Sequence, residues 1–200
     1  LVEGFDTPPV IMMAHSRQWQ DRVAAASGLA KEKDVLAWKY EVGELPKRAV
    51  RAWESIKKDA PEVKLRTVDT SRMKAELDVI MEIYNDAWEG KWAFVPTLPD
   101  EVEKMAQDLK LILDPDLAFM AEIEGKPVGM CIMLPNLNEA IHDLHGSLLP
   151  FGWAKALWRL KVKHPLSARL MLLGIRKELR NVRKYMGLSA AMYVEVARRG

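Results

Sequence analysis

The feature that most constrains the fold is a pair of apolar runs of strand length separated by a compact polar turn. The runs occupy residues 117–123 and 127–134, and the tripeptide Glu-Gly-Lys at 124–126 separates them. Apolar runs joined by a short turn that contains Gly are typical of a β-hairpin. A further continuous apolar run at 168–175 is typical of a strand in the middle of a sheet. A chain with these runs is predicted to fold around a β-sheet.

Helical patterns flank these predicted strands. Residues 63–69 alternate apolar and polar, as a half-buried strand does, and a helix capped by Ser71 follows. Pro99 is placed at the first turn of a second helix, where its missing N–H does no harm. Residues 136–163 are predicted to be helical with an interruption, and a last helix runs from about 185 to 199. The predicted class is α/β, with a mixed central sheet flanked by helices.

The N-terminal part is predicted to be a separate unit. Short apolar runs at 10–14 and 34–42 indicate two strands, with a helix between them that Ser16 caps and Gly28 ends. Residues 43–62 are charged and contain a short amphipathic helix at 48–58, which is typical of a linker. The predicted division is 1–42, 43–62 and 63–200. We also expect the chain to be a fragment of a longer protein.

Composition excludes several classes of protein. Hydrophobic residues make up 49% of the 200 residues, which is enough to bury a core, and the formal net charge is only +2, so no nucleic-acid partner is expected. The single cysteine, Cys131, rules out an internal disulfide framework and is consistent with a cytoplasmic location. No apolar segment approaches the roughly 20 residues that a transmembrane helix needs. The sequence therefore predicts a soluble, cytoplasmic protein with no membrane span.

The stretch LLGIRKELRNVRKYMGLSAAMY, at 172–193, carries the candidate chemistry. An apolar strand leads through a basic turn into a helix, and the first turn of a helix offers free N–H groups to an anion. Arg180, Arg183 and Lys184 can neutralise a pyrophosphate, and Gly187 permits close approach of the backbone. The stretch matches neither the P-loop nor the dinucleotide-binding motif. The alternative is that these cations coat an exposed helix start.

The order of elements and this turn resemble the GNAT superfamily of acyl-CoA-dependent N-acyltransferases. That superfamily binds pyrophosphate through the motif R/Q-x-x-G-x-G/A, and the nearest match here runs from Lys184 to Ser189, with Lys and Ser at two of the four motif positions. Wider phrases such as EIYNDAWEGKWAFVP and LNEAIHDLHGSLLPFGWAKALW resemble a poorly characterised group of large bacterial GNAT-like proteins with two GNAT-like halves. Residues 1–42 resemble the end of the upstream half.

The resemblance implies direct acyl transfer from acetyl-CoA or another acyl-CoA to a small-molecule or peptide amine. It assigns cofactor binding to the end of the fourth strand and the following turn. The implied residues are Leu173, Gly174, Ile175, Arg180, Arg183, Lys184, Met186, Gly187, Leu188 and Ser189. The fifth strand and a later helix would lie beyond Gly200, so the C-terminal strands are expected to be missing. Residues 1–42 either fill that place or remain the end of an upstream domain.

An aromatic group on the helix and loop after the first strand of the GNAT-like domain is the candidate acceptor site. Tyr84, Trp88, Trp92 and Phe94 are predicted to line a substrate pocket. The alternative is that they pack beneath a loop. Glu82 and Glu89 lie on the same helix as possible bases, but the sequence favours neither, and no catalytic residue is assigned.

Other candidate sites carry less weight. His142 and His145 have no evident third ligand, so no metal site is predicted, and Cys131 inside an apolar strand is predicted to be buried and inert. A basic cluster interleaved with Trp153 and Trp158 favours a rival function. It consists of Lys155, Arg159, Lys161, Lys163, Arg169, Arg176, Lys177 and Arg180. It could form a nucleic-acid or anionic-membrane binding module, and a catalytically silent acyl-CoA sensor is a further alternative.

Overall fold

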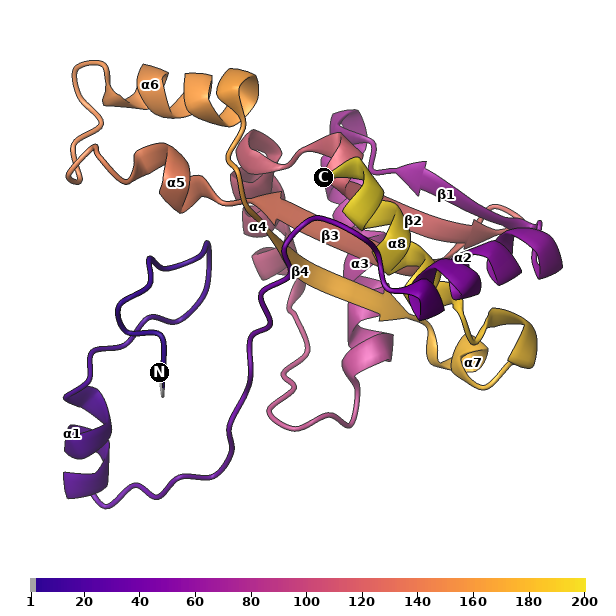
Figure 1. The fold of residues 1–200 in the computed structure, drawn as a ribbon, viewed down its shortest axis with the longest axis horizontal. Coiled ribbons are helices and arrows are strands. Elements are labelled where there is room, and N and C mark those ends of the chain that lie inside the picture. The colour runs from indigo at the N-terminus through magenta and orange to yellow at the C-terminus, as the bar shows by residue number, and fades with distance from the viewer. Residues whose placement is uncertain (1–2) are drawn as a thin grey trace.

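The computed structural model describes residues 3–200 and is built around one sheet with helices on both faces (Figure 1). Each strand is antiparallel to its neighbour, and the order in the sheet follows the chain. The strands are β1 (Val63–Thr67), β2 (Ala118–Ile123), β3 (Lys126–Pro135) and β4 (Ala168–Ile175). The strands predicted from the sequence after residue 62 are thus confirmed, and so is the α/β class. The sheet was predicted to be mixed, but among the described residues it is wholly antiparallel.

The β2–β3 hairpin has the turn that its sequence requires. Ile123 pairs with Lys126, so the loop is the dipeptide Glu124-Gly125, and both residues have positive φ, 51° and 77°. A two-residue turn with positive φ at both positions matches the right-handed twist of the strands that it joins. Gly125 takes this conformation at little cost, whereas Glu124 is one of the few side-chain-bearing residues held there.

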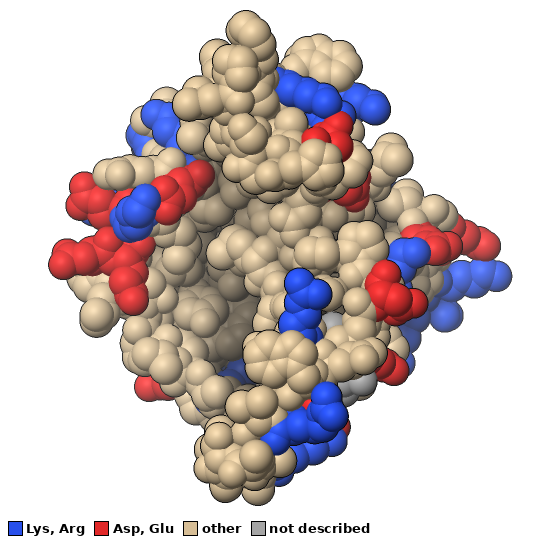
Figure 2. Space-filling view, turned by 90° about the vertical axis from the view of Figure 1, so that its left-hand side faces the viewer, with Lys and Arg blue, Asp and Glu red and all other residues tan. Residues whose placement is uncertain are grey.

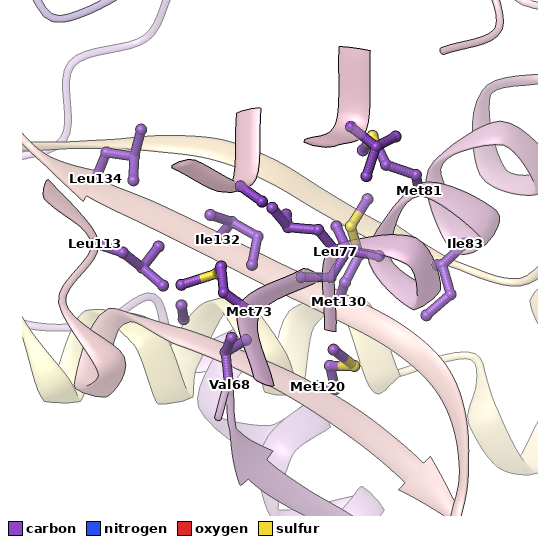
Figure 3. Packing of buried hydrophobic residues seen from close by; sticks show 14 of the residues in the cluster. Val68, Met73, Leu77, Met81, Ile83, Leu113, Met120, Met130, Ile132 and Leu134 are labelled. Atoms are coloured by element: carbon purple, nitrogen blue, oxygen red, sulfur yellow. The ribbon is translucent and has the colours of Figure 1, made fainter. Parts of the chain in front are cut away.

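Helices α3 (Met73–Trp88) and α4 (Pro99–Ile112) cover one face of the sheet. Ser71 does not cap α3 as predicted, because it lies in a 3₁₀ turn (Thr70–Arg72) in which the Asp69 side chain accepts a hydrogen bond from the Ser71 N–H. Pro99 begins α4 as predicted. Figure 3 shows the resulting core, in which side chains of α3 meet those of the central strands. Its members include Leu77, Ile80, Ile83, Met120, Met130 and Leu134.

Helices α2 (Lys47–Asp59) and α8 (Leu188–Arg199) cover the opposite face. They enclose a second core that contains Ile56, Phe119, Cys131, Leu188 and Met192. The helix predicted at 48–58 is therefore confirmed, and it packs against α8 and the sheet. The sheet lies between two apolar layers, which explains why β2 and β3 are continuous apolar runs.

The connection from β3 to β4 projects away from the sheet (Figure 1). It contains α5 (Leu137–Ile141), α6 (Gly152–Trp158) and a turn of π-helix at Arg159–Lys163, which confirms the predicted interrupted helical insertion. A short helix α7 (Lys177–Arg180) and a 3₁₀ turn (Arg183–Tyr185) then link β4 to α8. The last helix was predicted from about residue 185, and it begins three residues later because this turn precedes it.

The N-terminal segment differs most from prediction. Its helix α1 (Gln20–Ala26) is confirmed, but its N-cap is Trp19 and not the predicted Ser16. Neither 10–14 nor 34–42 forms a strand. Ile11 alone in the first run is buried, at 5% exposure, and Met12 has a positive φ of 54° that breaks an extended conformation. In the second run Val35 and Trp38 remain 79% and 88% exposed, so no apolar face is buried there. An apolar run without a strand partner stays irregular.

Candidate functional site

Strand β4 lies at the edge of the sheet and carries the start of the predicted site. Among the described residues its outer edge pairs with no strand, so backbone N–H and C=O groups on that edge are free of sheet hydrogen bonds. The pairing with β3 shifts between Ile132 and Met133, which leaves Met171 of β4 as an extra residue without a partner. A β-bulge of this kind bends an edge strand and often lies beside a functional site. β4 is thus a free edge strand with a bulge at Met171, and its C-terminal half, from Leu172 to Ile175, is regularly paired with β3.

Aromatic side chains form a wall beside the end of β4. Trp88 stacks on Tyr84 with ring centroids 4.9 Å apart, and Phe94 contacts Tyr84 at 5.6 Å. A Cβ built on Gly174 would lie 2.6 Å from Trp88 Cζ3, so only glycine fits at this point of β4. The structure therefore brings Gly174, from the predicted cofactor site, against the predicted substrate group.

Trp92, the fourth predicted substrate residue, lies outside this aromatic cluster. Its side chain is 55% exposed, and its ring faces Lys33 of the N-terminal segment, with Nζ 5.5 Å from the ring centroid. Tyr84, Trp88 and Phe94 are half-buried. Because Tyr84 and Trp88 also pack against the core of the α3 face, the cluster combines a structural role with one accessible surface.

The basic turn after β4 is held to α3 by its own cations. Arg180 donates to the carbonyl oxygens of Ala87, at 2.6 Å, and Ile175, at 3.3 Å. Two cations earlier in the turn form ion pairs with α3 and the residue after it, Arg176 with Glu82 and Lys177 with Glu89. These contacts close the chain against the end of α3. Arg180 is therefore committed to the fold, and Glu82 and Glu89, the possible bases, are both ion-paired.

Lys184 is also engaged. Its Nζ lies 2.7 Å from Glu62 Oε1, which also accepts a hydrogen bond from the Tyr185 hydroxyl at 2.7 Å. Hydrogen bonds from Lys184 and Tyr185 lower the pKa of Glu62 to about 2 and raise the pKa of both donors. This triad ties the 3₁₀ turn to the residue before β1. The charge of Lys184 is balanced within the protein.

The remaining predicted cofactor residues lie at the start of α8, where some of them have packing roles instead of binding a phosphate. A Cβ on Gly187 would lie 3.3 Å from Ala52 of α2, and its φ of −88° is ordinary, so this glycine permits close packing of α2 on α8. Leu188 is completely buried in the second core. Met186 and Ser189 are exposed, and the Arg183 side chain forms no hydrogen bond or ion pair with any described residue. Arg183 and the first-turn N–H groups of α8 remain available to an anion.

The candidate site is therefore the end of β4 together with the aromatic cluster and the start of α8. It combines the unpaired backbone groups of β4, the apolar surface of the aromatic cluster, and a weak anion-binding position at the N-terminus of α8. Such a surface suits an elongated molecule with amide groups, an apolar part and a phosphate. Sequence reasoning missed Glu62 and Asp86, whose carboxylates hold Tyr185 Oη and the Lys177 N–H. No local signal identifies them, because their partners are 123 and 91 residues away.

The other candidate residues take structural positions. Cys131 is completely buried in β3, which confirms the predicted burial, and desolvation raises the pKa of its thiol to about 12. His142 is bonded to the carbonyl oxygen of Glu139 through Nδ1. Within residues 3–200 no group of three His, Cys, Asp or Glu side chains gathers in a way that could hold a metal. Over the same residues, the helices are all too short or too polar to cross a membrane.

One face of the molecule is hollowed and sparsely charged. Figure 2 shows the side that carries the α5–α6 projection and the N-terminal segment, with a depression in its middle. Uncharged residues surround the depression, and most Lys, Arg, Asp and Glu side chains lie toward the periphery of the view.

Comparison with known proteins identifies two relatives. No protein-family model matches the chain. The chain is 45% identical over 180 residues to the bacterial ceramide synthase of Caulobacter vibrioides, an alignment that covers 89% of this chain and 46% of that protein. It is 39% identical over 180 residues to protein YghO of Escherichia coli K12, covering 89% of this chain and 45% of YghO. The chain spans about half the length of the curated relatives it matches.

These relatives correct the resemblance drawn from the sequence. The assignment to the GNAT superfamily and to acetyl-CoA-dependent N-acetylation is wrong, because neither relative carries such a name and no family model supports it. The physical reason is that a strand followed by a basic turn and a helix occurs in many folds. The key glycine, Gly187, serves helix packing here. The chain is instead similar to a protein named for the synthesis of a lipid.

Proposed function

We propose that this chain is part of an acyltransferase that joins a fatty acyl group to a long-chain amine through an amide bond. The observation that carries the proposal is its 45% identity, over 180 residues, to a protein named as a bacterial ceramide synthase. A ceramide is a fatty acid joined by an amide to a long-chain amino alcohol. The acceptor of this chain is then a lipid amine, in place of the small-molecule or peptide amine predicted from the sequence.

The chemistry requires an activated acyl donor, and we propose an acyl-CoA. The amine nitrogen attacks the acyl carbonyl, a C–N bond forms and the C–S bond breaks. The CoA thiol leaves with the proton that the amine loses. No described residue is assigned as the base, since the carboxylates near β4 are bound to Arg176 and Lys177.

The candidate site supports this proposal in three respects. The free edge of β4 supplies backbone groups for the amides of the pantetheine arm. The aromatic cluster of Tyr84, Trp88 and Phe94 supplies an apolar surface for an acyl chain. Arg183 and the first turn of α8 supply charge and N–H groups for a phosphate.

The test separates binding from turnover. Calorimetric titration with palmitoyl-CoA is expected to give saturable binding, and acetyl-CoA is expected to bind more weakly because it lacks the apolar chain. Mass spectrometry of a reaction with sphinganine and palmitoyl-CoA is expected to show the amide product. The absence of both saturable palmitoyl-CoA binding and amide product would overturn the proposal. Efficient acetylation of a soluble amine would overturn the lipid specificity.

A further inference from the structure

The α5–α6 projection exposes an unusual concentration of large apolar side chains. Eight of them fall within residues 148–166, and each is at least 42% exposed. They are Leu148, Leu149, Phe151, Trp153, Leu157, Trp158, Val162 and Leu166. Trp153 and Leu157 are one helical turn apart, as are Trp158 and Val162, so they form contiguous stripes along the projection. Exposed apolar surface of this extent marks an interaction site.

The charges of the same segment all have one sign. No Asp or Glu occurs between Asp143 and Glu178, whereas Lys and Arg recur through these residues. Asp143 is shared by Lys155 and Arg159. Lys161 and Lys163 have no carboxylate partner among the described residues, and Lys161 Nζ donates instead to the Leu113 carbonyl oxygen at 3.3 Å. A surface that combines Trp and Leu with Lys163, which has no ion-pair partner among the described residues, and with a segment free of carboxylates is complementary to an anionic and apolar partner.

The projection is braced from within, which fixes the orientation of its exposed residues. Arg159 donates to the Ala140 carbonyl oxygen at 3.1 Å and pairs with Asp143, which joins the π-helical turn to α5. Leu160, in the same turn, is only 4% exposed. One side of the segment is thus anchored on α5, the projection itself lies clear of the sheet (Figure 1), and the large apolar side chains of residues 148–166 stay exposed.

We propose that the α5–α6 projection docks onto an anionic lipid bilayer. Trp side chains are favoured at the level of the headgroups, and Phe and Leu side chains are buried at the boundary with the acyl chains. Lys side chains extend their charged ends toward lipid phosphates while their stems cover apolar surface. The projection thus lies in the membrane interface without crossing it. A protein partner would require carboxylates to match these cations, whereas an anionic bilayer presents negative charge over the whole contact.

The inference is tested by flotation of the chain with lipid vesicles, without any substrate, so its outcome is independent of the proposed acyltransferase activity. One set of vesicles contains phosphatidylcholine alone, and the other contains phosphatidylcholine mixed with phosphatidylglycerol. The chain is expected to float with the anionic vesicles at low salt, and less at high salt. Trp158→Ser and Lys163→Glu are expected to weaken this binding on the order of tenfold and several-fold, respectively.

Matched controls lie elsewhere on the molecule. Trp38→Ser removes a Trp that is 88% exposed in the N-terminal segment, and Lys58→Glu reverses an exposed charge at the end of α2. Neither is expected to alter flotation, and circular dichroism checks that all four variants fold. Equal binding to neutral and anionic vesicles, no binding to either, or an equal loss with Trp38→Ser would overturn the proposal. A dimer that Trp158→Ser dissociates, without flotation, would instead assign the surface to a second copy of the chain.

Discussion

Gly174 illustrates how a single residue sets the distance between two elements. The Trp88 ring occupies the place that a Cβ on residue 174 would take, at 2.6 Å from Cζ3. We expect Gly174→Ala to lower the free energy of unfolding by about 1 to 3 kcal/mol, because the ring must move within a packed core. Chemical denaturation measures the change. In the Gly174→Ala/Trp88→Leu double variant the smaller side chain relieves the clash, so the two costs are expected to be less than additive.

The matched control for this substitution is Gly43→Ala. A Cβ at residue 43 would meet nothing nearer than the Glu41 carbonyl oxygen at 3.9 Å, and Gly43 does not have a positive φ. Its effect on unfolding is expected to stay within about 0.5 kcal/mol. Equal destabilisation at the two glycines, or full additivity with Trp88→Leu, would show that the ring does not require glycine at 174.

Glu62 gives a prediction for pH dependence. Its hydrogen bonds with Lys184 and Tyr185 lower its pKa from an ordinary 4.5 to about 2 in the folded protein. A carboxyl with a lowered pKa stabilises the fold above its unfolded value and loses that contribution as the pH falls. The Tm difference between the wild-type chain and Glu62→Gln is therefore expected to be full above pH 4.5 and to shrink between pH 4.5 and about 2.

Thermal melts across that pH range make the measurement, with Glu54→Gln as the control. Glu54 is exposed on α2, and it does not contribute to the lowered pKa of Glu62. The Glu54 variant is expected to follow the wild-type chain at every pH. A Tm difference for Glu62→Gln that stays constant down to pH 2 would contradict the proposed role of the triad.

The aromatic cluster connects single residues to the proposed acyl-chain site. Phe94 lies on Tyr84 in the loop after α3, whereas Trp92 in the same loop faces outward. If the cluster contacts the acyl chain, Phe94→Ala weakens palmitoyl-CoA binding about tenfold, because apolar contact area is lost. Trp92→Ala serves as the control and is expected to change binding little. Calorimetry that shows the reverse order would place the acyl chain elsewhere.

Among the secondary-structure elements, the sequence predicts those that local chemistry defines. The β2–β3 turn, the Pro99 start of α4 and the whole of β4 follow from turn residues, a proline position and one apolar run. The strands predicted at 10–14 and 34–42 fail because an apolar run does not reveal whether a partner strand exists. Whether a segment pairs as a strand is decided by residues far away in the sequence. Here helices already cover both faces of the sheet.

For the candidate site, the sequence likewise predicts individual residues but not the contacts between distant ones. Placing Gly174 and Trp88 in two functional groups was possible from the sequence, but their contact joins residues in different elements. The basic turn was interpreted as free to bind an anion because its carboxylate partners lie far away in the chain. Glu62, Glu82 and Glu89 neutralise Lys184, Arg176 and Lys177 respectively, and leave Arg183 available.

The attachment of the N-terminal segment gives a prediction at the scale of an element. Ile11 is buried, and its N–H donates to Asn136 Oδ1 at 3.1 Å while its carbonyl oxygen accepts from Arg169 at 2.9 Å. Asn136→Ala leaves the Ile11 N–H unsatisfied, which costs about 1 to 3 kcal/mol. Amide hydrogen exchange at Ile11 is expected to accelerate at least about tenfold.

Asn138→Ala is the corresponding control. Asn138 donates to the Pro9 carbonyl oxygen at 2.8 Å in an exposed position, so water can replace it. Exchange at Ile11 is expected to remain near the wild-type rate in this variant. Unchanged exchange in Asn136→Ala would show that the segment is held mainly by burial of the Ile11 side chain.

For the whole molecule, the arrangement of two cores on one sheet determines how the chain unfolds. Leu77 belongs to the core of the α3 face and Met192 to that of the α8 face, yet both cores share strands β2 and β3. Successive residues of one strand, such as Phe119 and Met120, point to opposite faces of the sheet and therefore into different cores. Loss of either core therefore exposes one whole face of the shared strands, and the two cores are expected to unfold together.

The test uses one substitution in each core. Leu77→Ala and Met192→Ala are each expected to cost about 2 to 5 kcal/mol and to shift one common transition, seen alike by far- and near-ultraviolet circular dichroism. Hydrogen exchange is expected to be slowest in β2 and β3 and fastest in 24–42 and 144–151, where side chains are mostly exposed. Two separate transitions would mean that each helix layer has its own stability. A single transition would mean that the shared strands transmit every core defect to both faces, including the edge of β4 where the candidate site lies.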